Sequence, residues 1–156
     1  MLDITFNNET EEVLSMALLE EIRYYIQKTL TAEGVDWELL PLEISHTLVE
    51  PAQIRELNRE YRGIDRETDV LSFPMLNFPE DDDQLQEDTV IPVLLGDIVI
   101  SPAQAHKQGD EYGTGFDREM CYLTVHSVLH LLGYDHMEEE EKKVMRSREK
   151  IIMGDE

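Results

Sequence analysis

The sequence has few of the features that would direct a chain out of the cytoplasm or into a membrane. Cys121 is the only cysteine among 156 residues, so no disulfide can form within the chain. No apolar run approaches the roughly 20 residues that a membrane-spanning helix needs. The N-terminal residues also lack the basic and then apolar pattern of a secretory signal. We therefore expect a cytoplasmic protein without a membrane partner.

Basic residues are scarce as well. Thirteen lysines and arginines stand against 35 aspartates and glutamates, which gives a formal net charge of −22. This balance is the opposite of the basic surface that nucleic-acid-binding proteins present, and taken alone it argues against RNA as a partner; we expect no DNA partner. An RNA partner would require the basic residues to gather at one site with the acidic residues elsewhere, or RNA presented within a larger assembly.

The length and the hydrophobic patterning predict one domain over residues 1–156. Alternating or continuous apolar runs predict strands at residues 2–6, 42–48, 70–73 and 93–100. Apolar one-turn spacing and helix-start residues predict helices at about 10–30, from 51, from 102, across 120–132 and at 137–153. This order predicts an α+β fold, with one small mixed sheet of about four strands packed with helices.

Some positions within these elements can be assigned as well. We expect the buried stripes of two helices to consist of Ile54, Leu57 and Tyr61, and of Val144, Met145, Ile151 and Ile152. His46 falls on the apolar face of its strand and is expected to be a half-buried structural histidine. Residues 78–89, rich in Glu, Asp and Gln, are expected to form a mobile loop.

The strongest chemical signal is a set of three histidines around Gly133. His126 and His130 are four residues apart in a long apolar run, so a helix would place both imidazoles on one face. Gly133 can end that helix in a left-handed conformation, which lets the chain turn back and brings His136 to the same ion. Three neutral nitrogens leave one tetrahedral position open, as in catalytic zinc sites. We predict that the three histidines bind one Zn²⁺ per chain.

The spacing equals that of the metzincin signature HExxHxxGxxH, with one difference. Ser127 stands where those peptidases have their glutamate, and a hydroxyl that stays protonated at neutral pH cannot act as that general base. Asp97 and Asp135 are candidate substitutes. Asp135 could instead cap the turn at Gly133 or accept an N–H from a ligand histidine. We expect Ser127 to serve in packing or in hydrogen bonding to the helix backbone.

Three motifs together resemble the YbeY family of bacterial metal-dependent endoribonucleases. The metal segment is HSVLHLLGYDH at residues 126–136, LNREYRG and TDVLSFP occupy residues 57–63 and 68–74, and LGDIVIS occupies residues 95–101. The family often has glycine directly after the first histidine, so Ser127 is a small departure. The resemblance implies a metal-dependent endoribonuclease that cleaves single-stranded RNA in ribosomal RNA maturation and ribosome quality control. It implies ribosomal RNA, the small ribosomal subunit and ribosome-associated proteins as partners.

Cleavage of a phosphodiester calls for a permanent cation near the metal, because negative charge builds on the non-bridging oxygens. From the chain alone, Arg62 is a surface arginine in a turn. The resemblance, in which the matching arginine is functional, makes Arg62 the candidate catalytic residue. Two alternatives remain: a zinc-dependent hydrolase of peptides or small esters, and a non-catalytic ribosome-assembly factor whose metal mainly stabilises the fold.

Overall fold

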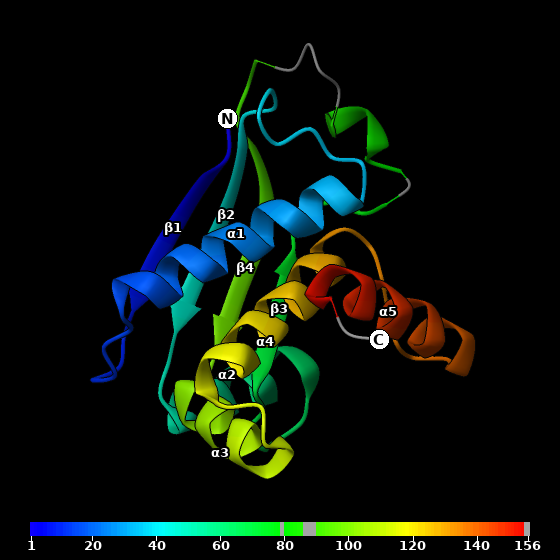
Figure 1. The fold of residues 1–156 in the computed structure, drawn as a ribbon. Coiled ribbons are helices and arrows are strands. Elements are labelled where there is room, and N and C mark those ends of the chain that lie inside the picture. The colour runs from blue at the N-terminus through cyan, green and yellow to red at the C-terminus, as the bar shows by residue number, and fades with distance from the viewer. Residues whose placement is uncertain (79, 86–89, 155–156) are drawn as a thin grey trace.

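A four-stranded mixed sheet lies at the centre of the structure, a computed structural model that describes residues 1–78, 80–85 and 90–154 (Figure 1). The spatial order of the strands is β1 (Asp3–Asn8), β2 (Leu42–Leu48), β4 (Val93–Ile100) and β3 (Val70–Pro74). β1, β2 and β4 are parallel, and β3 pairs with β4 in the antiparallel direction. The predicted α+β class and the predicted order of elements are confirmed.

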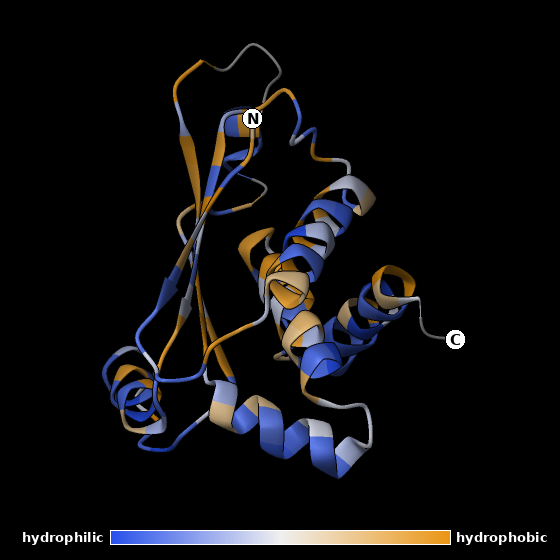
Figure 2. Cartoon of the chain, turned by 60° about the vertical axis from the view of Figure 1, so that its left-hand side comes forward, coloured by the Kyte–Doolittle hydropathy of each residue, from blue (hydrophilic) through white to orange (hydrophobic). Residues whose placement is uncertain are grey.

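Three helices lie on one side of the sheet. α1 (Met16–Ala32) and α4 (Phe116–Leu131) contact each other, and α5 (Glu139–Met153) lies against both of them. Figure 2 shows these helices beside the sheet, with blue hydrophilic and orange hydrophobic residues alternating along them. The buried stripe of α1 has the one-turn spacing of an amphipathic helix and consists of Leu18, Ile22, Ile26 and Leu30. The main hydrophobic core therefore lies between the sheet and α1 and α4.

Helix α2 (Pro51–Arg62) packs on a separate, smaller cluster formed by Val49, Ile54, Leu71 and Val99. The expectation that Tyr61 is buried is wrong, because its side chain is exposed and only the edge of its ring meets Phe73. Asn58 takes the buried position, with its amide donating to the Arg66 carbonyl at 2.9 Å. The buried face of α2 thus includes the polar Asn58, which hydrogen-bonds to the following loop, in place of the apolar ring of Tyr61.

Helix α1 begins at Met16, later than the start near residue 10 that the one-turn spacing of apolar residues predicts. Residues 10–15 form no helix because the Asn8 and Thr10 side chains hydrogen-bond with neighbouring backbone groups and with each other. Ser15 then caps the helix by accepting from the Leu18 N–H at 3.1 Å. Helix α3 (Pro102–Tyr112) starts in the predicted way, with Ser101 as its cap.

Helix α5 turns a different face inward from the predicted one. Met145 and Ile152 are buried as expected, whereas Val144 and Ile151 are exposed. The remaining buried positions are Glu149 and Met153, so a carboxylate lies in the apolar stripe. Arg148 fastens the helix to the end of α1, with Nε 2.8 Å from the Glu33 carboxylate and Nη2 donating to the Ala32 carbonyl at 3.0 Å.

His46 of β2 lies in the core between the sheet and α4. It is fully buried rather than half-buried, and burial lowers the pKa of its imidazole to about 4. Thr124 uses its hydroxyl hydrogen on the Met120 carbonyl, so its oxygen accepts from His46 Nε2 at 3.1 Å. His46 Nδ1 has no hydrogen-bond partner among the described residues. The structural role predicted for this histidine agrees with these contacts.

Part of the acidic segment at 78–89 has regular structure. Asp82–Leu85 form a short 3-10 helix, and residues 79 and 86–89 of the expected loop lie outside the described residues. Among the helices that the structure describes, none combines the length and the apolar character needed to cross a membrane.

Candidate metal centre

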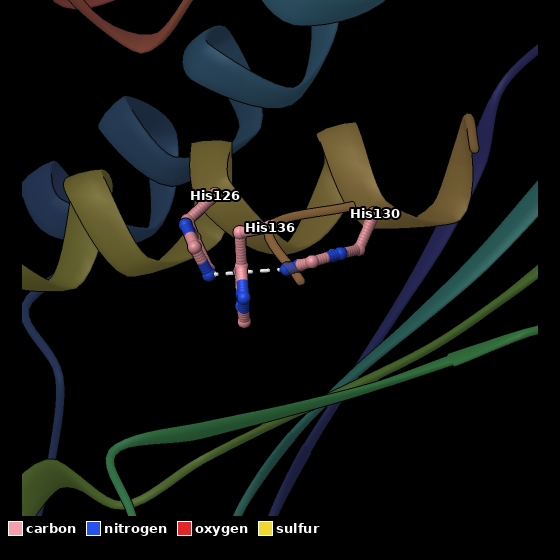
Figure 3. A group of neighbouring side chains, drawn as sticks. All are labelled: His126, His130 and His136. Carbon is pink, nitrogen blue, oxygen red and sulfur yellow. Dashed lines mark hydrogen bonds between the residues drawn. The ribbon is translucent and has the colours of Figure 1, made fainter. Parts of the chain in front are cut away.

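The three predicted histidines converge on one point (Figure 3). His126 and His130 project from successive turns of α4, and His136 reaches them from the loop that follows the helix. One nitrogen of each ring lies within 4.8 Å of the others, and the Nε2 atoms of His126 and His130 are 3.2 Å apart. The structure thus contains a three-histidine group able to hold a metal ion.

The other ring nitrogens are held by hydrogen-bond acceptors. His126 Nδ1 donates to the Glu149 carboxylate at 2.6 Å, and His130 Nδ1 donates to the Tyr134 carbonyl at 2.8 Å. Because both partners only accept, the proton of each neutral ring sits on Nδ1 and the Nε2 lone pairs face each other. Two such lone pairs repel at this distance unless a cation lies between them. The donor set therefore fits a metal ion bound by imidazole nitrogens.

The electrostatic surroundings also suit metal binding. Burial, and after it the neighbouring His126 and His136, lower the pKa of the His130 imidazole to about 4. A ring with this pKa is neutral at physiological pH, and a neutral imidazole is the form that binds metal. His130 is thus available as a ligand without first losing a proton.

The turn after α4 is built as the glycine predicts. Gly133 has a φ of +102°, a backbone conformation that residues with a Cβ rarely adopt. The carboxylate of Asp135 accepts from the backbone N–H of His136 at 2.7 Å. Asp135 therefore caps the turn that presents His136, and this bond does not involve a ligand ring.

Two other candidate residues form hydrogen bonds with serine side chains of the sheet. Ser127 is fully buried and its hydroxyl lies 2.6 Å from that of Ser72 on β3, so it packs α4 onto the sheet instead of bonding to the helix backbone. Asp97 pairs with Ser45 across β4 and β2, one position from the His46 and Ile98 pair that faces α4. Because strand side chains alternate, Asp97 lies on the opposite face of the sheet. The suggestion that Asp97 replaces the missing glutamate is wrong.

Arg62 lines the same pocket as the three histidines. It is the last residue of α2, and Gly63 ends that helix in the left-handed conformation. The rest of the pocket comes from the β3 segment and from the metal loop, and consists of Thr68, Asp69, Val70, Leu71, Ser72, Pro74, Asp135 and Met137. Within the described part of the chain, Arg62 forms no ion pair. Its positive charge is therefore available to a ligand in the pocket.

Comparison with known proteins identifies the family. The family model described as Endoribonuclease YbeY matches residues 3–155. A relative from Clostridium botulinum (strain 657 / Type Ba4), named Endoribonuclease YbeY, is 44% identical over 95% of this chain and 86% of its own length. A relative of the same name from Thermoanaerobacter sp. (strain X514) is 43% identical over 98% and 96% of the two chains.

The chain belongs to the YbeY family.

A solved structure agrees in fold with this assignment. The solution structure of TM1509 from Thermotoga maritima has a TM-score of 0.56 to this chain, with 24% sequence identity and coverage of 99% and 90% of the two chains. At that level of identity the likeness concerns the fold alone. The family model and the relatives match nearly the whole chain. They confirm the resemblance to the YbeY family of the motifs around residues 57–74, 95–101 and 126–136.

In this YbeY-family chain, sequence reasoning missed the residue that holds His126. Glu149 is buried on α5, and its second carboxylate oxygen accepts from the Tyr122 hydroxyl at 3.0 Å. The available signal was a charged residue at the helical spacing of the buried stripe, between Met145 and Ile152. A buried carboxylate needs partners, and its two hydrogen bonds supply them.

Proposed function

We propose that this protein is a metal-dependent endoribonuclease that cleaves single-stranded RNA. One observation carries the proposal: in a chain of net charge −22, an arginine without an ion pair in the described residues lines the same pocket as three convergent histidines. Membership of a family described as Endoribonuclease YbeY supports the same reaction. A phosphodiester is the substrate class that needs both features.

His126, His130 and His136 would hold the metal through their ring nitrogens. When bound, the ion supplies Lewis-acid chemistry, which lowers the pKa of a coordinated water or polarises a substrate oxygen. Glu149 fixes the orientation of the His126 ring, and the Tyr134 carbonyl fixes that of His130. We propose zinc as the ion, because three imidazoles with one further position are typical of catalytic zinc sites.

Arg62 is proposed to stabilise the developing negative charge on the phosphate. Its guanidinium is planar, permanently charged and able to donate to two phosphate oxygens at once. The side chain stands at the end of a helix, next to the sharp turn at Gly63, and faces the pocket. A lysine in its place would act only as a point charge, which predicts that Arg62→Lys keeps part of the activity and Arg62→Ala less.

The biological substrate is proposed to be ribosomal RNA. The relatives' name, Endoribonuclease YbeY, supports an RNA substrate, and resemblance to the YbeY family implies a role in ribosomal RNA maturation and ribosome quality control, with the small ribosomal subunit and ribosome-associated proteins as partners. Such a role belongs in the cytoplasm. An acidic surface suits a protein that meets its RNA inside an assembly, since it suppresses binding to other nucleic acids.

The experiment compares zinc-loaded wild type with His130→Ala, Arg62→Lys and Arg62→Ala. Each is given structured ribosomal RNA, single-stranded RNA and a generic peptide library, and zinc content and thermal midpoint are measured on the same preparations. Arg66→Ala is the matched control, because Arg66 is an exposed arginine of the following loop that does not line the pocket. Loss of one electrostatic stabiliser typically costs roughly 2–4 kcal/mol in the barrier.

We expect RNA cleavage by wild type and Arg66→Ala, a large loss in Arg62→Ala with zinc and stability retained, and no cleavage by His130→Ala. Negligible peptide cleavage is expected because Ser127 leaves no general base at the peptidase position. Unchanged RNA cleavage in Arg62→Ala would refute the role of this arginine. Cleavage of peptides that depends on His130 would favour a peptidase, and absence of all cleavage would favour an assembly factor.

A further inference from the structure

A second pocket adjoins the metal centre on the far side of His126. His126 and Asp69 line both pockets, so a molecule that occupies one can extend into the other. The second pocket lies among α3, α4 and α5, and its other lining residues include Gln108, Tyr112, Arg118, Glu119, Tyr122, Arg146 and Lys150. Aromatic rings, an amide, cations and the carboxyls of Asp69, Glu119 and Glu149 are therefore gathered beside the metal site.

Glu119 is the unusual residue in this pocket. The residue as a whole is 4% exposed, its side chain lines the pocket, and it has no hydrogen bond or ion pair with any residue that the structure describes. Its carboxyl is therefore free of protein partners in the described residues and can be reached by a molecule in the pocket. Burial raises the pKa of Glu119, and the negative charge of Asp69 raises it further. A ligand with N–H donors would stabilise the ionised form of Glu119 and so offset both increases in its pKa.

Two cations at the pocket are also without ion-pair partners among the described residues. Arg146 and Lys150 lie one turn apart on α5, and both line the pocket. Elsewhere on the same helix, Lys142 pairs with Glu139, Lys143 with Glu140 and Arg148 with Glu33. In so acidic a chain, cations that stay unpaired next to a catalytic site are suited to an anionic ligand.

We propose that this pocket binds the nucleotide next to the cleaved bond, with Glu119 accepting hydrogen bonds from a guanine base and Arg146 and Lys150 contacting its phosphate. This inference rests on the proposed endoribonuclease function and adds a base preference to it. The pocket shares His126 with the metal site, so a nucleotide bound there is adjacent to the phosphate that faces Arg62.

Guanine follows from the chemistry of the carboxylate. An ionised carboxylate only accepts hydrogen bonds, and its two oxygens match two neighbouring N–H donors. Guanine offers N1–H and N2–H side by side on its Watson–Crick edge, whereas adenine, cytosine and uracil each offer one donor beside an acceptor. Bases of single-stranded RNA are read on this edge while stacked on aromatic side chains, and Tyr112 and Tyr122 supply such rings.

The test measures binding separately from cleavage. Zinc-loaded protein is titrated with fluorescent 2′-O-methyl phosphorothioate pentauridylates, which resist cleavage, carrying guanosine, adenosine or uridine at the centre. Wild type should bind the guanosine probe roughly ten-fold more tightly than the uridine probe, the discrimination of a bidentate contact. Glu119→Gln should lose this preference and turn toward adenosine, because an amide offers one donor and one acceptor. Asp117→Asn, an exposed acid on the same helix, is the matched control and should behave as wild type.

Substitution of the two cations, Arg146 and Lys150, should change probe binding in a different way from substitution of Glu119. Arg146→Gln and Lys150→Gln should weaken all three probes equally and reduce the salt dependence of binding, while Lys143→Gln should change neither. Equal binding of the three probes by wild type, or a guanine preference that survives in Glu119→Gln, would overturn the inference. Cleavage of natural RNA without base preference would overturn it as well, and leaves the endoribonuclease proposal standing. A wild type that cleaves no RNA refutes the endoribonuclease itself.

Discussion

Removal of the Glu149 carboxylate should weaken metal binding without unfolding the protein. Glu149 contributes no ligand, and acts by accepting from His126 Nδ1 at 2.6 Å while Tyr122 donates to its other oxygen at 3.0 Å. In Glu149→Leu the His126 ring loses the partner that fixes its proton on Nδ1 and its Nε2 toward the ion. Residues that orient metal ligands in this way typically contribute 10–100-fold in metal affinity.

The size of the effect should depend on what replaces the carboxylate. Glu149→Gln keeps an oxygen that can accept from His126 but loses the negative charge, so we expect roughly a ten-fold loss of zinc affinity. Glu149→Leu removes both, and its loss should approach a hundred-fold, or about 2.7 kcal/mol. Tyr122→Phe leaves the bond between Glu149 and His126 in place and should have the smallest effect of the three.

Zinc affinity is measured by competition with a chromophoric chelator, and the thermal midpoint of the metal-free protein is measured in parallel. Glu140→Gln is the control, because Glu140 is an exposed acid on the same helix and pairs only with Lys143. A Glu149→Leu protein that is folded and binds zinc as tightly as wild type would refute the reasoning. A thermal midpoint that collapses in the metal-free Glu149→Gln protein would show that the residue acts on folding instead.

Three further predictions concern the metal, the pH dependence of stability and the backbone. Wild type should hold one zinc per chain by elemental analysis, and His136→Ala should lose most of it; full occupancy in that variant would exclude the three-ligand arrangement. His46 has a pKa of about 4 in the folded protein and 6.5 when exposed in the unfolded chain. As the pH falls from 6.5 to 4, the unfolded chain therefore binds the proton first, and the free energy of unfolding should drop by about 3 kcal/mol. His46→Gln should flatten this part of the curve of thermal midpoint against pH, and an unchanged slope would contradict the assignment. Gly96→Ala should cost about 3 kcal/mol or more by urea unfolding, because its Cβ would lie 2.4 Å from the Phe73 carbonyl oxygen at a φ of +149°; a near-native urea midpoint would show that the strands can separate there.

The three ligands could be predicted because their placement depends on local geometry. His126, His130 and His136 lie within one helix turn and the loop after it, so the helical repeat and one glycine bring them together. The same is true of the four strands along the chain and of the start of α3 after Ser101, which follow from hydrophobic patterning and from a short motif. Arg62 reached the site only through resemblance to a family, since no local pattern relates residue 62 to residue 126.

The remaining errors have tertiary causes. Both Asn58 and Tyr61 have the helical spacing from Ile54 that a buried residue needs. Asn58 is the buried one because its amide donates to the carbonyl of Arg66 in the following loop. Val144 and Ile151 are the more hydrophobic choice for α5, but the face turned inward includes Glu149, whose partners come from α4. The pairing of Asp97 with Ser45 likewise depends on strand register, which hydrophobicity alone leaves open.

Several side chains that support the site come from helix α5 alone. Glu149, Arg146 and Lys150 all enter through this one helix, which Arg148 fastens to Glu33 at the end of α1. Local unfolding of α5 would withdraw the support of His126 and two cations in a single step, while the helix that carries His126 and His130 stays folded. Because zinc binds the closed form more tightly than a form that lacks Glu149, a higher zinc concentration should make this opening less frequent. Hydrogen exchange at the amides of Glu139–Met153 therefore reports metal binding from a segment that contributes no ligand.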